Sequence, residues 1–173
     1  MFSKNLFFSP LTVLIFTLAL TTFSTAQSKS KNEILTDNAL KRIVPTSFYF
    51  AGQSAETQMR NTAAAQLSEN RFVIVGLVDT SGYSTDISGK YEGFFITDSP
   101  VRIGDKMLGT GAYGFGFSQS GKVNFFDLSS KQILSVTTTS DAEMKRPRPL
   151  LMTGTANGVR LYKGKNYVLI SAK

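Results

Sequence analysis

The hydrophobic pattern divides the chain into an apolar N-terminal segment, a polar segment and a long region of short apolar runs. In the last of these, from about residue 70 onward, apolar-rich runs alternate with pairs of turn-forming residues. Runs of this length joined by such pairs predict antiparallel hairpins. The turn pairs are Gly104-Asp105, Ser120-Gly121, Ser129-Ser130, Asn157-Gly158 and Gly164-Lys165.

One helical pattern precedes the hairpins. Ser54 stands where a helix N-cap is expected, and apolar residues then recur at four-residue spacing around three consecutive alanines. These apolar residues are Met59, Ala63 and Leu67. We therefore predict one helix at residues 55–68, within a single β-rich domain at 43–173. The predicted fold class is all-β, a small antiparallel β-barrel or sandwich with this N-terminal helix packed on it. The alternative is an α+β sheet with the helix on one face.

Residues 1–26 have the three parts of a secretory signal peptide. A positive charge near the start is followed by the apolar segment Leu6–Leu20, and small residues precede the predicted cleavage before Gln27. This apolar segment is shorter than the roughly 20 residues that a membrane-spanning helix needs. We expect a secreted or periplasmic protein without a transmembrane anchor after cleavage, in which residues 27–42 form a polar N-terminal tether.

The composition removes several kinds of chemistry. The chain has no cysteine and no histidine, which excludes disulfides, thiolate or imidazole metal sites, cysteine nucleophiles and Ser-His-Asp triads. We therefore expect neither a metal nor a cofactor. A domain of this length can bury enough apolar surface to fold without disulfides, so the lack of cysteine is compatible with export.

The glycine-aromatic segment LGTGAYGFGFS has rings on one face of a predicted strand and small residues on the other, because side chains alternate along a strand. The rings are Tyr113, Phe115 and Phe117. Our interpretation is that the rings face a core and that the small face seats the alanines of the predicted helix. The alternative is that these rings, together with Phe125, line a pocket for an apolar ligand.

Positive charge gathers near the C-terminus. The segment Lys145–Lys173 has seven basic and no acidic residues, which equals the net charge of +7 of the whole chain. The basic candidates for binding are Arg146, Arg148, Arg160, Lys163 and Lys165. Such a cluster attracts anionic partners of the cell envelope, such as lipid headgroups or surface glycans. Nucleic acid is disfavoured because no binding motif is present, and the alternative is a solubilising surface.

The segment Val78-Asp79-Thr80-Ser81-Gly82 follows an apolar run and resembles the Asp-Thr-Gly active-site turn of aspartic proteases. In that family two aspartates share a proton and activate water, so the resemblance implies a catalytic role for Asp79. Ser81 is an extra residue that moves the glycine out of the family's register. The competing interpretation is a polar turn in which Asp79 caps its own backbone.

Rings and positive charge outweigh catalytic side chains in this sequence. We therefore expect an exported, non-enzymatic binding module, whose ligand is either an apolar small molecule in a ring-lined interior or an anionic envelope component on the basic C-terminal face. The alternative is a structural or protein-interaction component of the envelope. A third alternative is a carboxylate-based hydrolase of the aspartic type.

Overall fold

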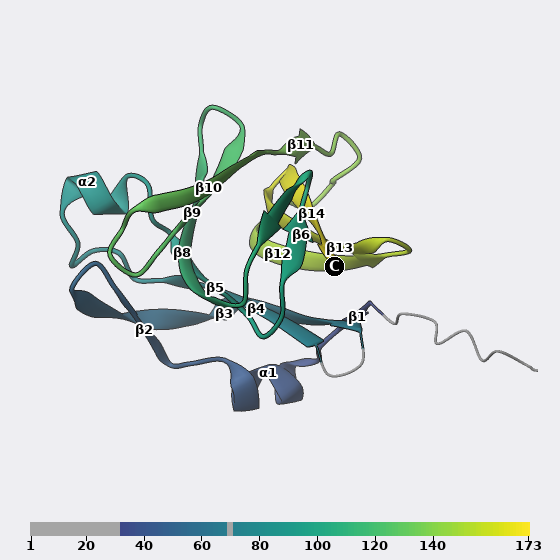
Figure 1. Ribbon diagram of the computed structural model, residues 1–173, viewed down its shortest axis with the longest axis horizontal. Coiled ribbons are helices and arrows are strands. Elements are labelled where there is room, and N and C mark those ends of the chain that lie inside the picture. Colours follow the sequence, from purple (N-terminus) through teal and green to yellow (C-terminus); the bar gives the residue numbers. More distant parts are fainter. Residues whose placement is uncertain (1–31, 69–70) are drawn as a thin grey trace, which may run out of the picture.

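The computed structural model describes residues 32–68 and 71–173, which form two antiparallel β-sheets packed face to face (Figure 1). The predicted signal peptide lies outside the described residues. In the larger sheet the strand order is β1-β3-β4-β5-β8-β9-β10, and β2 pairs with β3. Its strands are β1 (Glu33–Ile34), β2 (Ser47–Phe50), β3 (Gln53–Ser68), β4 (Arg71–Val78), β5 (Gly93–Thr97), β8 (Gly111–Ser118), β9 (Lys122–Phe126) and β10 (Gln132–Thr137).

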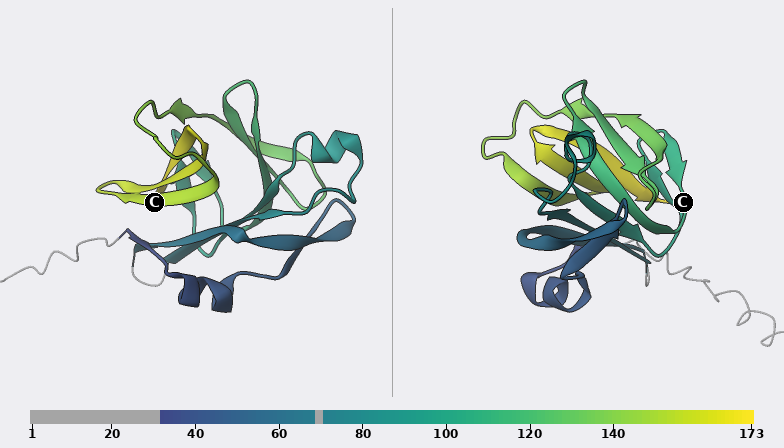
Figure 2. Two further views of the ribbon diagram at one scale, coloured as in Figure 1. Left: turned by 180° about the vertical axis from the view of Figure 1, so that it is seen from behind. Right: turned by 90° about the vertical axis from the view of Figure 1, so that its left-hand side faces the viewer.

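The smaller sheet has the order β12-β13-β14-β6-β7, with β11 beside β14. Its strands are β6 (Val101–Ile103), β7 (Lys106–Leu108), β11 (Thr139–Ser140), β12 (Arg148–Thr155), β13 (Gly158–Gly164) and β14 (Asn166–Ala172). The described helices are α1 (Asp37–Ile43) and α2 (Thr85–Ser88). Figure 2 shows the two sheets as separate layers. The predicted all-β class is confirmed, and of the two predicted architectures the structure is the sandwich.

All five predicted turn pairs lie where two consecutive antiparallel strands join, and Gly158 and Gly164 are themselves the first and last residues of β13. At the β6–β7 turn, for example, Gly104 has a φ of 58°, a backbone conformation that glycine adopts without steric cost. No helix in the described residues is long and apolar enough to cross a membrane.

The predicted helix at residues 55–68 is wrong. These residues belong to β3, a strand of 16 residues that pairs with β4 on one side and with β1 on the other. Ala63, Ala65 and Leu67 also alternate at every second position, and all three are buried in the core. Pairing on both edges and burial of one face outweigh the helical preference of three alanines, because local propensity is a weak determinant.

The predicted tether is also wrong within the described residues. Ile34 of β1 pairs with Ala65, and α1 follows at Asp37–Ile43. A polar composition thus conceals a short edge strand and a helix. None of the residues of α1 is buried, so the helix covers the outer face of the larger sheet incompletely.

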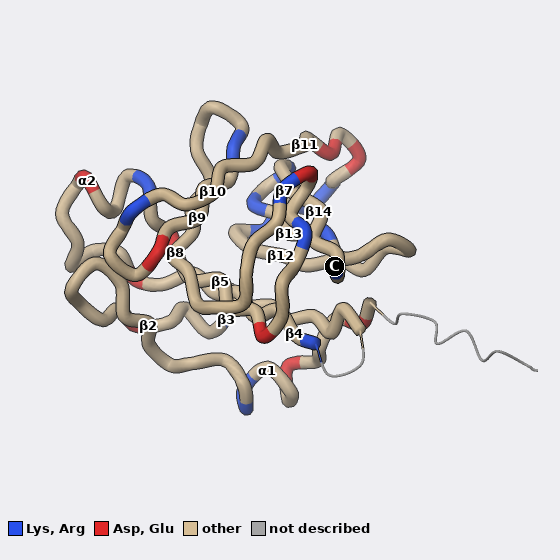
Figure 3. The backbone as a smooth tube through the Cα atoms, viewed as in Figure 1, with Lys and Arg blue, Asp and Glu red and all other residues tan. Residues whose placement is uncertain are grey.

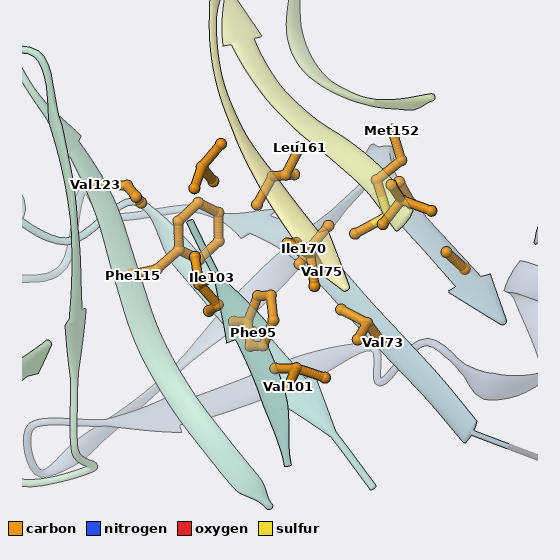
Figure 4. Packing of buried hydrophobic residues seen from close by; sticks show 14 of the residues in the cluster. Val73, Val75, Phe95, Val101, Ile103, Phe115, Val123, Met152, Leu161 and Ile170 are labelled. Atoms are coloured by element: carbon orange, nitrogen blue, oxygen red, sulfur yellow. The ribbon is translucent and has the colours of Figure 1, made fainter. Parts of the chain in front are cut away.

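The main core lies between the sheets. Figure 4 shows Phe95 and Phe115 from the larger sheet packing toward Ile103, Leu161 and Ile170 from the smaller one. A second cluster covers the other face of the larger sheet, and its largest rings are Phe50, Tyr91, Phe94 and Phe126. The larger sheet is therefore buried on both faces over much of its area, as the continuous apolar run in β4 predicts.

The strand β8 has the predicted division of faces, with a different partner on its small face. Phe115 is fully buried in the main core. On the opposite face, a Cβ at Gly114 would meet the ring of Phe50, and a Cβ at Gly116 would meet the backbone carbonyl of Lys90. The small face therefore seats β2 and the segment after α2. The expectation that it seats a helix was wrong because residues 55–68 are a strand.

Candidate functional site

A hollow of about 570 Å³ lies where the end of β8 meets the smaller sheet. We call it the basic hollow. Its lining residues are Phe117, Ser118, Gln119, Pro147, Arg148, Pro149, Lys163, Gly164, Lys165 and Asn166. One predicted ring and three predicted cations converge here, from segments that lie about thirty to fifty residues apart in the sequence. The structure thus brings one ring of the glycine-aromatic segment beside three of the five basic candidates.

Glu92 fixes the geometry of this hollow. Its side chain accepts a hydrogen bond from the Phe117 backbone N–H at 2.9 Å through Oε2. Its other carboxylate oxygen forms an ion pair with the Lys163 ammonium. One carboxylate therefore holds the strand that presents Phe117 in the larger sheet and Lys163 in the smaller sheet, and this keeps ring and cation beside each other.

Lys163 lies on the side of β13 that faces the main core, since Val159 and Leu161 on the same side are fully buried. Burial lowers the pKa of Lys163 from its ordinary value, because a desolvated ammonium is less stable. Arg148 and Lys165 are exposed and form no ion pair with another described residue. These two cations carry the charge that a bound anion would meet, while Lys163 is already matched by Glu92.

The remaining basic candidates lie elsewhere. Arg160 projects from the opposite face of β13, where its guanidinium lies 4.6 Å from the centre of the Tyr167 ring. It also donates a hydrogen bond to the Tyr162 hydroxyl at 3.3 Å, and Tyr162 in turn donates to Asp141 at 2.9 Å. Arg146 is exposed and does not line the basic hollow. Figure 3 shows several Lys and Arg positions around the smaller sheet.

The other predicted rings pack in the core. Phe115 and Phe125 have no exposed surface, and Phe125 makes an edge-to-face contact with Phe95 at a centroid distance of 5.2 Å. Tyr113 is half-buried, and its hydroxyl donates to the carbonyls of Gly109 and Thr110. The four rings do not share one accessible surface, and Phe117 is the ring that reaches the basic hollow.

A second hollow, which we call the apolar groove, lies between α1 and the outer face of the larger sheet and has a volume of about 450 Å³. Its apolar lining residues are Leu35, Ala39, Ile43, Phe72, Ile74 and Ile96. The groove exists because α1 leaves this part of the sheet uncovered. Its polar lining residues include Asp98, whose two carboxylate oxygens both accept from the Phe72 backbone N–H at 2.9 and 3.0 Å.

Asp79 forms a polar turn. Its carboxylate accepts a hydrogen bond from the Ser81 backbone N–H at 3.0 Å. This bond and a side-chain hydrogen bond with Ser81 lower the pKa of Asp79. A shared-proton pair of aspartates would raise the pKa of one member. In the described part of the chain, no group of three or more acidic residues is placed to hold a metal ion.

Sequence reasoning missed Glu92, Lys41 and Arg60. The last two line a further hollow of about 540 Å³ that also includes Arg148. No local pattern marks these residues, because packing of the two sheets brings them beside segments distant in the sequence. Glu92 is 25 positions from its partner Phe117.

Comparison of the chain with protein-family models, curated proteins and solved structures finds no match.

Proposed function

We propose that the protein is an exported binding module that holds an anionic ligand in the basic hollow and does no chemistry on it. The observation that carries the proposal is the convergence of Arg148 and Lys165, which form no ion pair with another described residue, with the Phe117 ring around one hollow. Arginine and lysine supply charge-assisted hydrogen bonds to carboxylate, sulfate or phosphate groups. A half-buried ring beside them supplies apolar contact, as binding hollows commonly do.

The experiment measures binding of fluorescently labelled polygalacturonate by anisotropy, at salt concentrations from about 0.1 M to about 1 M. The screening length falls from ~10 Å to ~3 Å over this range, so we expect the affinity to fall steeply. Arg148→Gln and Lys165→Gln should each weaken binding about five- to tenfold. The matched control is Arg102→Gln, which removes an exposed charge outside the basic hollow.

Binding that is absent, or that is unchanged by salt and by both substitutions, would exclude the basic hollow as an anion site. An equal loss in Arg102→Gln would show that net charge matters and the hollow does not.

The export part of the proposal rests on the N-terminal pattern alone. It is tested by mass spectrometry of the protein recovered outside the cytoplasm of an expressing cell. We expect the recovered chain to begin at Gln27, as the predicted cleavage requires. A recovered chain that still begins at Met1 would contradict cleavage.

A second candidate ligand is an apolar small molecule, and the apolar groove favours it. Its volume of about 450 Å³ is in the range of small-molecule sites, which are lined mainly by apolar side chains. The uncharged dye N-phenyl-1-naphthylamine should bind with a fluorescence increase that Ile43→Ser reduces. Ile133→Ser is the control, because Ile133 is similarly exposed and does not line the groove. If the dye does not bind, the groove supports instead the structural or protein-interaction alternative.

A further inference from the structure

Arg148 lines two hollows at once. One is the basic hollow, and the other has a volume of about 540 Å³ and is lined by Asp37, Leu40 and Lys41 of α1, Met59, Arg60 and Thr62 of β3, and Arg148. We call the second the helix hollow. Figures 1 and 2 both show β3 running between α1 and β12, the strand that begins at Arg148. The two hollows adjoin at Arg148, which lines both.

The helix hollow is cationic. Lys41, Arg60 and Arg148 face one acidic lining residue, Asp37. Lys41 and Arg60 are exposed, and neither forms an ion pair with another described residue. Together with Lys165 of the basic hollow, unpaired cations thus follow one another through both hollows. A ligand with a single anionic group would use one part of this series, whereas a ligand with repeated anionic groups would use all of it.

Apolar surface lies between the cations. Leu40 and Met59 contribute it in the helix hollow, and Met59 is 40% exposed. Phe117, Pro147 and Pro149 contribute it in the basic hollow. An inorganic polyphosphate has no apolar surface to cover these side chains. A single-stranded nucleic acid binds by stacking successive bases on several aromatic side chains, and among these lining residues Phe117 is the one ring.

We infer that the ligand is an acidic polysaccharide whose chain passes through both hollows, over Arg148. Its carboxylates recur along the chain and pair with the guanidinium groups of Arg60 and Arg148, which bind carboxylates in a bidentate geometry. The apolar C–H faces of its sugar rings cover Leu40, Met59 and Phe117. This inference rests on the proposed function, because it extends the anion site at the basic hollow.

The test uses isothermal titration calorimetry to compare the affinity of oligogalacturonates of two and eight residues. The sample is the full protein in the form that the expressing cell produces. We expect the eight-residue chain to bind at least about tenfold more tightly, since linked contacts add to one another. Arg60→Gln should weaken binding of the eight-residue chain about five- to tenfold and leave the two-residue chain unaffected. Lys165→Gln should weaken both ligands, and Arg102→Gln should weaken neither.

Thermal melts of each variant show whether it is folded, and Lys41→Gln replaces Arg60→Gln if the latter melts early. If Lys165→Gln weakens both ligands and neither Arg60→Gln nor Lys41→Gln affects the longer one, the basic hollow acts alone. The inference that a polysaccharide passes through both hollows is then wrong, and the proposed function stands. If neither ligand binds the wild-type protein, both proposals fail. Equal affinity for oligothymidylate of matched charge would overturn the assignment to polysaccharide.

Discussion

Close backbone approach determines which residues the strand β8 can tolerate. At Gly116 a Cβ would overlap the carbonyl oxygen of Lys90, which is backbone and cannot rotate away. The alternation of rings and glycines in LGTGAYGFGFS correctly indicated that something approaches the small face closely. It could not indicate what, because the partners Phe50 and Lys90 come from segments that carry no complementary pattern in the sequence.

Gly116→Ala should lower the free energy of unfolding by about 1–3 kcal/mol, since an inserted methyl group must displace backbone. The matched control is Gly82→Ala, because no heavy atom lies within 4 Å of a Cβ at that position. Urea unfolding followed by circular dichroism measures both variants. Equal transition midpoints for the two would contradict the close approach at Gly116.

The elements themselves were predicted unevenly. The hairpins after about residue 70 were recognisable because their turn residues and strand lengths agree with each other. The strand β3 was not recognised, because Met59, Ala63 and Leu67 fit a helical spacing while Ala63, Ala65 and Leu67 fit alternation. The strand conformation prevails because β3 pairs with β1 and with β4. The sequence of β3 alone does not reveal these two partners.

The ion pair of Glu92 and Lys163 links the two sheets and is a measurable element of the packing. Their side chains are 23% and 36% exposed, respectively, so the pair is partly desolvated. Glu92→Gln should destabilise the fold by about 1–2 kcal/mol because it leaves a half-buried ammonium without its counter-charge. Adding Lys163→Met should recover most of that loss.

A double-mutant cycle in guanidinium chloride measures this coupling. Arg102→Gln, combined with Glu92→Gln, provides the control pair without contact. Strict additivity of the Glu92 and Lys163 substitutions would show that the ion pair does not contribute to stability.

At the scale of the whole molecule, the site depends on how the sheets meet. The sequence indicated a basic C-terminal segment. Alternation along a strand places Arg160 and Lys163 on opposite faces of β13, but it could not indicate that Arg148 and Lys163 line one hollow. Lys41 and Arg60 join Arg148 through the packing of α1 and β3. Residues that come together from different layers of the fold show no common spacing in the sequence. This part of the surface could therefore not be predicted.

Because Tyr91 is buried, we expect the free energy of unfolding to fall at alkaline pH. The Tyr91 side chain has no exposed surface, and its hydroxyl has no hydrogen-bond partner in the described residues. Burial raises the pKa of Tyr91 far above its ordinary value of 10.0. Above that pH the unfolded chain releases the proton while the folded chain keeps it, so stability falls by about 1.4 kcal/mol per pH unit through this residue.

Tyr91→Phe should therefore show a shallower loss of stability with pH and be at least as stable as wild type near neutral pH. Lys163 acts in the opposite direction, because its lowered pKa makes stability rise with pH until an unfolded lysine also loses its proton, near 10.5. Above pH 10.5 the contribution of Lys163 to stability no longer changes with pH, so the difference between the variant and wild type reports on Tyr91. If the free energy of unfolding falls with pH at the same slope in the variant and in wild type, the predicted effect of Tyr91 is contradicted.

The pairing of β14 with β6 joins Ile170 to Ile103, sixty-seven positions apart. At a synthesis rate of about 5–20 residues per second, roughly 3 to 13 seconds separate the appearance of these two partners. Until the final strand emerges, the middle of the smaller sheet has no neighbour on that edge. The smaller sheet can therefore complete its hydrogen bonding only after nearly all of the described chain has been synthesised, whereas every strand of the larger sheet is available by Thr137.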